Sequence, residues 1–260
     1  MELNLRGRTA LITGASKGIG LSSAEVLASE GVNLILVSRT QSDLDAARQK
    51  IAARFNVNVR VHAYDLSDSR NVDALVAEHA DIDILVNNAG AIPGGDLQQI
   101  TEDRWRAAWD LKVFGYINMC RRFYAEMKTR RRGVIINVLG MAGEKMDRGY
   151  IAGSTGNAAL MAFTKALGGS AGDDGLRVVG INPGAIATDR LVTLMKVRAA
   201  NSLGDENRWE ELMKPLPMGR AGKPEEIGTM VAFLASDISA YTTGTIITID
   251  GGAVNRGPMF

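Results

Sequence analysis

The stretch Thr9-Ala-Leu-Ile-Thr-Gly-Ala-Ser-Lys-Gly-Ile-Gly20 decides the fold of this chain of 260 residues. Its apolar run Ala10–Ile12 has the length and flanks of a buried parallel strand. Gly14, Gly18 and Gly20 follow, and then a periodic segment that indicates a helix. Glycine lets the backbone turn sharply and approach a phosphate, and a helix start presents free N–H groups to an anion. The stretch predicts a phosphate-binding strand–loop–helix unit, with a purely structural glycine turn as the alternative.

Apolar runs of strand length alternate with amphipathic stretches along the rest of the chain. Strands are expected at 9–13, 33–37, 58–63, 84–87, 133–138, 176–181 and 245–249. Helices are expected at 19–29, 42–55, 69–80, 101–128, 155–171 and 224–236. This alternation predicts right-handed βαβ units, and therefore an α/β fold whose doubly wound, seven-stranded parallel sheet carries helices on both faces. Ligands of such sheets bind at the carboxyl ends of the strands.

Composition and charge exclude several classes of protein. Hydrophobic residues make up 46% and charged residues 23%, with a net charge of +1, which is ordinary for a globular domain and favours neither nucleic acid nor an anionic membrane. The single Cys120 cannot form an internal disulfide, and we find no signal-peptide core and no long apolar run. A cytoplasmic protein without a membrane span is expected. Without a Pro/Ser linker or an internal repeat, residues 1–260 are expected to form one domain.

Four motifs, in order along the chain, resemble those of the short-chain dehydrogenase/reductase family. They are Thr13-Gly-Ala-Ser-Lys-Gly-Ile-Gly20, Asn87-Asn-Ala-Gly90, Asn182-Pro-Gly184 with Thr188, and Asp250-Gly-Gly252. The similarity covers essentially the whole chain. It implies a single-domain Rossmann fold, a nicotinamide cofactor, a small-molecule substrate and a homo-oligomer, either a dimer or a homotetramer.

The resemblance also implies which residues contact the cofactor. An acidic residue after the third strand would meet the adenine, the Asn-Asn-Ala-Gly turn would let the cofactor pass, and the Pro-Gly turn would line the nicotinamide. Each of these turns has an ordinary structural alternative. The expected set is Gly14, Ser16, Lys17, Gly18, Ile19, Gly20, Arg39, Asp65, Leu66, Asn87, Ala89, Gly90, Pro183, Gly184, Ile186 and Thr188.

Two cations at the adenosine end favour NADP(H) over NAD(H). The second strand ends in Ser38-Arg39-Thr40 without an acidic residue, and Lys17 lies in the glycine loop. An acidic side chain at this place would hold the 2′-hydroxyl of NAD, whereas arginine suits a 2′-phosphate. The alternatives are that both cations are solvated surface charges, or that Arg39 stacks on the adenine.

The family's catalytic Asn, Ser, Tyr and Lys are all replaced. By motif matching, their positions hold Lys112, Gly140, Gly153 and Asn157. Lys112 and Asn157 have exchanged residue types, which suggests that an ammonium group reaches the site from the other helix. Chance drift is the alternative.

Tyr150 is the candidate proton donor, because it precedes Asn157 by seven residues and enoyl-reductase relatives of the family use Tyr-x6-Lys. Seven residues are two helical turns, so Tyr150 would face the cleft if the helix extends that far back; Gly149 and Gly153 argue against this. A nearby ammonium would favour the phenolate. Alternatively, Tyr150 packs at a subunit contact. Ser154 is expected to cap the helix, or else to hold a substrate carbonyl.

The segment 186–217 is too long for a simple crossover and corresponds to the family's substrate lid. His62 and His79 look isolated, so no metal site is expected. Together these features predict an enzyme, an NADP(H)-dependent oxidoreductase acting on a carbonyl/alcohol pair through a non-standard active site. The alternative is a nucleotide-binding protein without redox turnover, such as a lyase, an isomerase or a regulatory sensor subunit.

Overall fold

A single parallel sheet organises the chain in the computed structural model, which describes residues 2–257 except for the side chains of residues 197, 198 and 201. The strand order is β3-β2-β1-β4-β5-β6-β7. Each predicted strand overlaps an observed one, with its ends shifted by at most two residues. The strands are β1 (Thr9–Thr13), β2 (Asn33–Ser38), β3 (Val59–Ala63), β4 (Ile84–Asn87), β5 (Gly133–Val138), β6 (Leu176–Pro183) and β7 (Ile246–Ile249).

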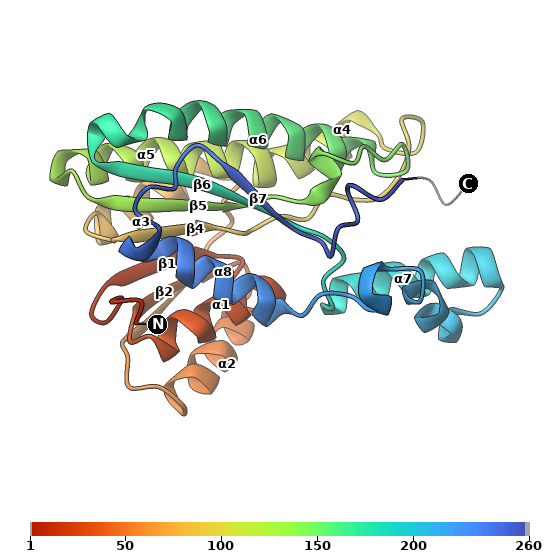
Figure 1. The fold of residues 1–260 in the computed structure, drawn as a ribbon, viewed down its shortest axis with the longest axis horizontal. Helices are drawn as coiled ribbons and strands as arrows, with labels where there is room; N and C mark the ends of the chain where they lie inside the picture. The colour runs from red at the N-terminus through yellow and green to blue at the C-terminus, as the bar shows by residue number, and fades with distance from the viewer. Residues whose placement is uncertain (1, 258–260) are drawn as a thin grey trace.

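Helices cover both faces of the sheet, as the sequence predicts. Figure 1 shows α1, α2 and α8 below the sheet and α5 and α6 above it, while α3 packs with α5. The resulting α/β sandwich is a doubly wound Rossmann fold. The helices are α1 (Gly18–Ser29), α2 (Gln41–Ala52), α3 (Ser69–His79), α4 (Glu102–Trp109), α5 (Gly115–Arg130), α6 (Ile151–Ala171), α7 (Asp189–Leu203) and α8 (Pro224–Ala235).

The two faces of the sheet bury separate hydrophobic clusters, because successive side chains of a strand point to opposite faces. In β1, Ala10 and Ile12 belong to the cluster that contains Leu27 of α1. Leu11, between them, belongs to the cluster that contains Phe123 of α5. Burial on both sides explains why β1 is a continuous apolar run.

The strand order reverses beside β1, which opens a crevice between the loops after β1 and β4. The side chain of Thr13 bridges these loops: its Oγ1 accepts from the backbone N–H groups of Asn88 at 2.9 Å and Ala89 at 3.0 Å. In return, Asn88 Nδ2 donates to the Thr13 and Gly14 carbonyls at 3.1 and 3.2 Å. The glycine loop is therefore held against the Asn-Asn-Ala-Gly turn.

Two predicted helices differ from those observed. The stretch expected at 101–128 is split into α4 and α5 by the π-helix η1 (Asp110–Phe114). The helix expected from residue 155 begins at Ile151, so Gly153 does not stop it, but the helix does not extend back to Tyr150. Gly153 serves packing, because a Cβ there would overlap the ring of Tyr150.

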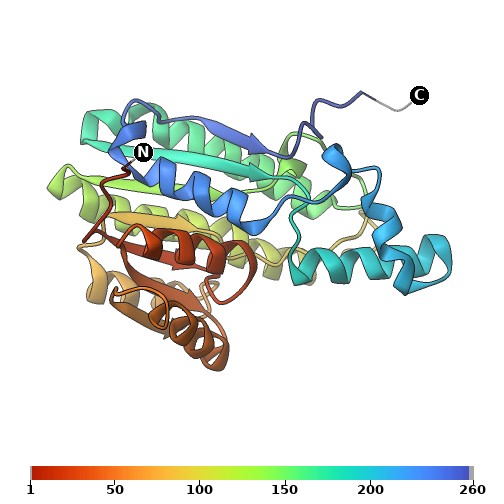
Figure 2. The same cartoon turned by 60° about the horizontal axis from the view of Figure 1, so that its bottom comes forward.

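The segment after β6 extends away from the sheet (Figures 1 and 2). It contains α7, the 3-10 helix η4 (Glu206–Met213) packed against α7, and the short turn η5 (Pro217–Gly219). The chain then returns to the sheet through α8 and β7. Within residues 2–257, no helix combines the length and apolar character that crossing a membrane requires.

Candidate active site

A cavity of about 250 Å³ lies at the carboxyl ends of β1, β2 and β4, where the sequence places the cofactor. Six of the predicted cofactor residues line it: Gly14, Ser16, Arg39, Leu66, Ala89 and Gly90. The remaining lining residues are Val37, Ser38, Thr40, Asp43, Tyr64, Ala91 and Leu111.

The two cations predicted at the adenosine end have different surroundings. Arg39 lines the cavity and is exposed. Lys17 lies immediately before α1, and its Nζ is 2.9 Å from Asp43 Oδ2. Asp43 also lines the cavity, from the first turn of α2. Arg39 therefore lies at the wall of the cavity, and Lys17 is held in an ion pair with Asp43 of that wall.

The predicted residues at the nicotinamide end meet the glycine loop. An added Cβ on Gly18 would lie 3.1 Å from Cγ2 of Thr188. Thr188 is also the N-cap of α7, where its Oγ1 accepts from the backbone N–H of Leu191 at 3.4 Å. Gly184 passes so close to Asp250 that a Cβ would lie 2.7 Å from the Asp250 Cα. Because Thr13 also bonds to Asn88 and Ala89, all four quoted motifs converge at the carboxyl ends of the strands.

Two other predicted cofactor residues are engaged with the protein. The Asp65 carboxylate accepts from Ser67 N at 3.0 Å and Ser67 Oγ at 2.8 Å. Asn87 is fully buried, and its Nδ2 donates to Asn137 Oδ1 at 2.9 Å. Asn137 in turn donates to Thr164 Oγ1 at 3.0 Å. The side chain of Asn87 therefore links β4 to β5 and α6.

Lys112 is buried in η1 with its ammonium group turned towards β5. Its Nζ donates to Tyr116 Oη at 2.7 Å and to the Val138 carbonyl at 2.7 Å, and the Tyr116 hydroxyl donates to the same carbonyl at 2.9 Å. The stem of Lys112 packs on Gly90, where a Cβ would lie 2.6 Å from its Cδ. Burial, and secondarily the charge of Arg190, lower the pKa of Lys112 to about 7.

Asn157 lies beside Gly140 and is turned back along α6. Its Nδ2 donates to the Gly153 carbonyl at 2.9 Å, and its buried Oδ1 has no hydrogen-bond partner among the described residues. An added Cβ on Gly140 would lie 3.1 Å from Asn157 Nδ2. Lys112 and Asn157 therefore lie on elements that pack together, but the ammonium of Lys112 bonds to the end of β5.

Tyr150 is the residue immediately before α6, and its ring fills the space beside Gly153. Burial raises the pKa of Tyr150, and the guanidinium of Arg190 beside the phenol opposes this shift. Arg190 also donates to the Gly90 carbonyl at 3.0 Å and to the Ile92 carbonyl at 2.7 Å. This arginine joins α7, the turn after β4 and the candidate proton donor.

Sequence reasoning missed Arg190, which lies within the segment 186–217. The signal that pointed to it was its place two residues after Thr188, a predicted cofactor contact, at the start of a helix. Glu144, in the loop between η2 (Met141–Gly143) and α6, was missed as well. Its Oε1 accepts from Asn182 Nδ2 at 2.7 Å and from Thr248 Oγ1 at 3.0 Å, which ties the loop to β6 and β7.

The predicted capping role of Ser154 is wrong, because α6 begins before this residue. The N-cap position belongs to Tyr150, which makes no side-chain cap. Ser154 is buried instead, and its Oγ accepts from the backbone N–H of Asp147 at 3.0 Å. The hydroxyl therefore holds the charged loop that precedes the helix.

The prediction that His62 and His79 are isolated from each other and from carboxylates is also wrong. Strand β3 and the end of α3 bring their Nε2 atoms to 2.8 Å from each other. The Oε2 atom of Glu78 lies 3.8 Å from His62 Nε2 and 3.7 Å from His79 Nε2.

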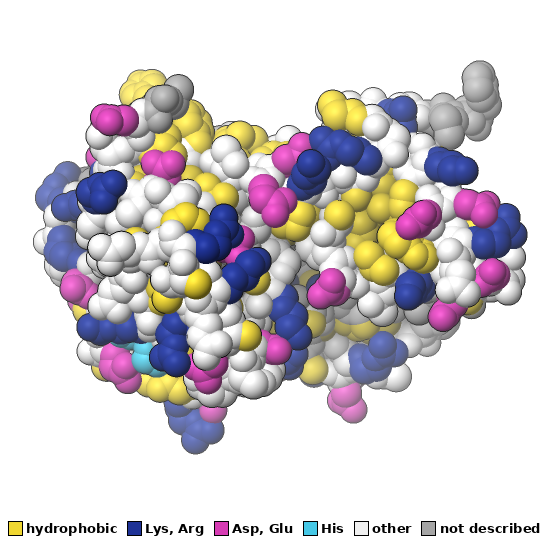
Figure 3. Space-filling model, turned by 90° about the horizontal axis from the view of Figure 1, so that it is seen from below, with side chains coloured by type: hydrophobic (Ala, Val, Ile, Leu, Met, Phe, Trp, Pro, Cys, Tyr) yellow, Lys and Arg dark blue, Asp and Glu magenta, His cyan; other side chains and the backbone are white. Residues whose placement is uncertain are grey.

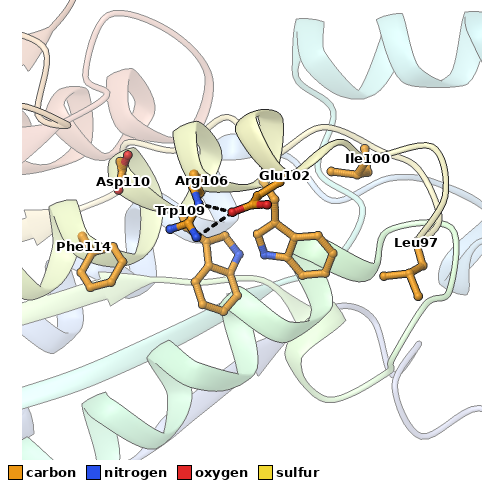
Figure 4. A pocket seen from close by; sticks show the side chains of 8 residues that line it. Leu97, Ile100, Glu102, Arg106, Trp109, Asp110 and Phe114 are labelled. Atoms are coloured by element: carbon orange, nitrogen blue, oxygen red, sulfur yellow. Dashed lines mark hydrogen bonds and ion pairs between the residues drawn. The ribbon is translucent and has the colours of Figure 1, made fainter.

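A second cavity, of about 460 Å³, follows α4 and η1 (Figure 4). Two tryptophans, Trp105 and Trp109, form its floor with ring centroids 6.2 Å apart. An ion pair joins Arg106 to Glu102 beside them. This cavity shares no lining residue with the one that holds the predicted cofactor contacts, so we place the candidate site at the latter. Its lining residues are Leu97, Ile100, Glu102, Trp105, Arg106, Trp109, Asp110 and Phe114.

Comparison with known proteins finds oxidoreductases whose similarity spans nearly the whole chain. The sequence model of the family described as enoyl-(acyl carrier protein) reductase matches residues 14–254. The 3-oxoacyl-(acyl-carrier-protein) reductase FabG of Chlamydia trachomatis is 33% identical over 252 residues, which span 95% of this chain and 98% of that protein.

Solved structures agree with the sequence relatives. The L-sorbose reductase of Gluconobacter frateurii, solved with NADPH and L-sorbose, superposes with a TM-score of 0.91 at 30% identity, covering 99% of this chain and 100% of the other. A protein described as a short chain dehydrogenase/reductase family protein superposes with a TM-score of 0.85 at 31% identity, covering 98% and 100%.

Proposed function

Because the chain belongs to the short-chain dehydrogenase/reductase family, we propose that it is an NADP(H)-dependent reductase of a small carbonyl compound, with Tyr150 as the proton donor. The observation that carries this proposal is the position of Arg190. Its guanidinium bonds to the turn after β4 and lies beside the Tyr150 phenol. A phenol can protonate a developing alkoxide, and a cation beside it stabilises the phenolate that remains.

The residues at the crevice fit a dinucleotide. A Cβ on Gly20 would overlap the Gly14 carbonyl, so this loop keeps a turn that only glycine permits. The loop leads into the N-terminus of α1, which attracts a pyrophosphate. Arg39 at the cavity and Lys17 at its rim support a preference for a 2′-phosphate, and therefore for NADP(H) over NAD(H).

In the proposed reaction, two side chains of the protein handle the proton. When bound, the nicotinamide supplies the hydride for the carbonyl carbon. Tyr150 gives its phenolic proton to the oxygen that becomes the alcohol, and Arg190 stabilises the phenolate that remains. Burial keeps Tyr150 protonated near neutral pH, because it raises the pKa of the phenol.

Lys112 has a supporting role in this proposal. Its ammonium holds the Val138 carbonyl at the end of β5, and its stem lies against Gly90. It thus fixes the end of β5 against the turn after β4. We also propose that the segment 186–217 closes over the substrate, with Arg190 as its contact to the sheet. A homo-oligomer stays a prediction that light scattering would check.

One variant pair tests the proton donor. NADPH and NADH are first titrated by fluorescence, and the protein is then assayed with ketones, enones and acyl thioesters. Tyr150→Phe should lower kcat by about a hundredfold or more while leaving NADPH affinity unchanged. Tyr241→Phe, at a fully exposed tyrosine, is the matched control and should retain activity. Full activity of Tyr150→Phe would remove Tyr150 from the mechanism.

A second candidate function follows from the internal bonds of the replaced tetrad. The Lys112 ammonium and the Asn157 amide both donate to backbone carbonyls of the protein. This arrangement favours a protein that binds the dinucleotide without redox turnover, such as a sensor subunit, a lyase or an isomerase. Tight NADPH binding without turnover of any carbonyl class would select it.

A further inference from the structure

We propose that His62, Glu78 and His79 form a binding site for a single Zn²⁺ ion at the β3 edge of the sheet. This site is independent of the proposed reductase function. Two imidazole nitrogens and one carboxylate oxygen converge there, and the same ligand set, with a water in the fourth position, holds zinc in many enzymes.

The distances suit a tetrahedral ion. Nitrogen ligands lie about 2.0–2.1 Å from zinc, so two corners of the tetrahedron are about 3.4 Å apart. In the structure the Nε2–Nε2 edge is 2.8 Å, and the two edges to Glu78 Oε2 are 3.8 and 3.7 Å. Shifts of roughly half an ångström would give every edge its zinc-bound length. Because the carboxylate belongs to an exposed side chain, it can make such a shift.

Local structure directs the imidazoles inwards. His79 ends α3 and is buried, whereas His62 lies on β3 and is half-buried. A histidine side chain reaches the surface among acidic and basic groups in Figure 3 (cyan), which gives an ion access from solvent. Without metal, one Nε2–H donates to the other Nε2. Both Nε2 atoms become ligands once the donor ring carries its proton on Nδ1 instead.

The composition makes the site easy to test. The chain has two histidines in all, so imidazole ligation in an untagged protein can come only from this pair. The one cysteine, Cys120, is buried in the core and distant in sequence. A spectroscopic signal from a bound ion therefore reports on this site.

The experiment uses the untagged full chain after treatment with a chelator. Zn²⁺ is titrated by calorimetry, and Co²⁺ is titrated by visible absorption. We expect one equivalent of Zn²⁺ to bind, the melting temperature to rise by several degrees, and Co²⁺ to give the intense visible bands of a tetrahedral ion.

Three variants assign the ligands. His62→Asn and Glu78→Gln should each weaken Zn²⁺ binding by at least tenfold. Substituting even a residue that only supports a metal ligand lowers metal affinity by about 10–100-fold. Asp81→Asn, which removes a charge close to His79 without removing a ligand, is the control and should bind as the unchanged chain does.

Circular dichroism of each variant confirms folding, and Glu78→Gln, at an exposed position, is the variant that folding defects will affect least. The absence of saturable Zn²⁺ binding by the unchanged chain would overturn the proposal. So would binding that survives both ligand substitutions.

Discussion

At the scale of single residues, Lys112 is the least expected side chain of the molecule. A buried ammonium loses its hydration, and its two acceptors, Tyr116 Oη and the Val138 carbonyl, are neutral. The pKa of Lys112 therefore falls from 10.5 to about 7. The free energy of unfolding must depend on pH wherever the folded and unfolded chains differ in bound protons at this residue.

Whether the free energy of unfolding rises or falls with pH depends on whether the folded or the unfolded chain binds the proton of Lys112 more tightly. Below about pH 7 both states are protonated, and Lys112 adds no pH dependence. Between about pH 7 and pH 10 the unfolded chain keeps a proton that the folded chain has lost, so the free energy of unfolding rises with pH. Urea titrations near both limits should show a rise of roughly 2–4 kcal/mol relative to Lys112→Met. Lys165→Met, at an exposed lysine of α6, should not remove the rise; a Lys112→Met protein with the same pH slope as the unchanged chain would contradict this account.

Gly153 is the second informative residue, because its missing side chain makes room for Tyr150. Gly153→Ala should displace the ring, cost about 1–3 kcal/mol in the free energy of unfolding and lower kcat. Gly169→Ala lies in the same helix, where an added Cβ meets nothing within 4 Å. It should raise the free energy of unfolding by roughly 0.5–1 kcal/mol. Thermal melts compare the stabilities of Gly153→Ala and Gly169→Ala. Equal changes in stability would mean that the Tyr150 ring does not need the space beside Gly153.

At the scale of elements, hydrophobic periodicity predicted every strand but could not predict η1. A strand buried on both faces is a continuous apolar run, as Leu34–Val37 shows, and this signal is local. A π-helix has the same composition as the α-helix around it, so it leaves no mark in the pattern. The predicted start of α6 was wrong for a related reason: glycine is typical of helix ends, yet Gly153 lies inside α6, where it makes room for the ring of Tyr150.

Some residues of the candidate site could be predicted from the sequence, and others could not. Motif spacing predicted six residues that line the cavity at the carboxyl ends of β1, β2 and β4, because glycine loops and strand ends are local features. Arg190, Glu144 and the histidine pair depend on contacts between elements distant in the chain, and no single-sequence pattern contains these. The packing of α7 on the β4 turn had to be seen before Arg190 could be assigned.

The buried polar chain between β4, β5 and α6 is a test at this scale. Asn137 accepts from Asn87 and donates to Thr164, so its loss leaves Asn87 Nδ2 with only the weak acceptor Cys120 Sγ and Thr164 Oγ1 with only the Leu160 carbonyl. Asn137→Ala should lower the free energy of unfolding by roughly 1–3 kcal/mol, because each lost hydrogen bond contributes about 0.5–1.5 kcal/mol. Urea denaturation measures it, with Gln98→Ala at an exposed amide as the control. Similar midpoints for both variants would show that the chain of bonds is not stabilising.

At the scale of the whole molecule, the segment that extends away from the sheet is attached to the crevice through Arg190. Its guanidinium reaches carbonyls 98 and 100 residues earlier in the chain. Arg190→Met should release this attachment, speed backbone hydrogen exchange in α7 and raise the KM of the substrate. Arg190→Lys keeps the positive charge but cannot make both hydrogen bonds. Compared with Arg190→Met, it should therefore have a lower pKa of Tyr150, while hydrogen exchange in α7 stays fast. Unchanged exchange in Arg190→Met would mean that α7 is held by other contacts.

The π-helix η1 has one further consequence, which concerns chain length. A π-turn holds one residue more than an α-turn, so α4 and α5 together contain one residue beyond what an uninterrupted helix of that span needs. Deleting a single residue such as Leu111 would let the helix close into regular α-helix, and both flanks would keep the faces they present now because the wide turn absorbs the extra residue. Lys112 lies within the wide turn, so the direction of its side chain would change. The position of that ammonium is therefore set by an insertion of one residue as much as by the lysine itself.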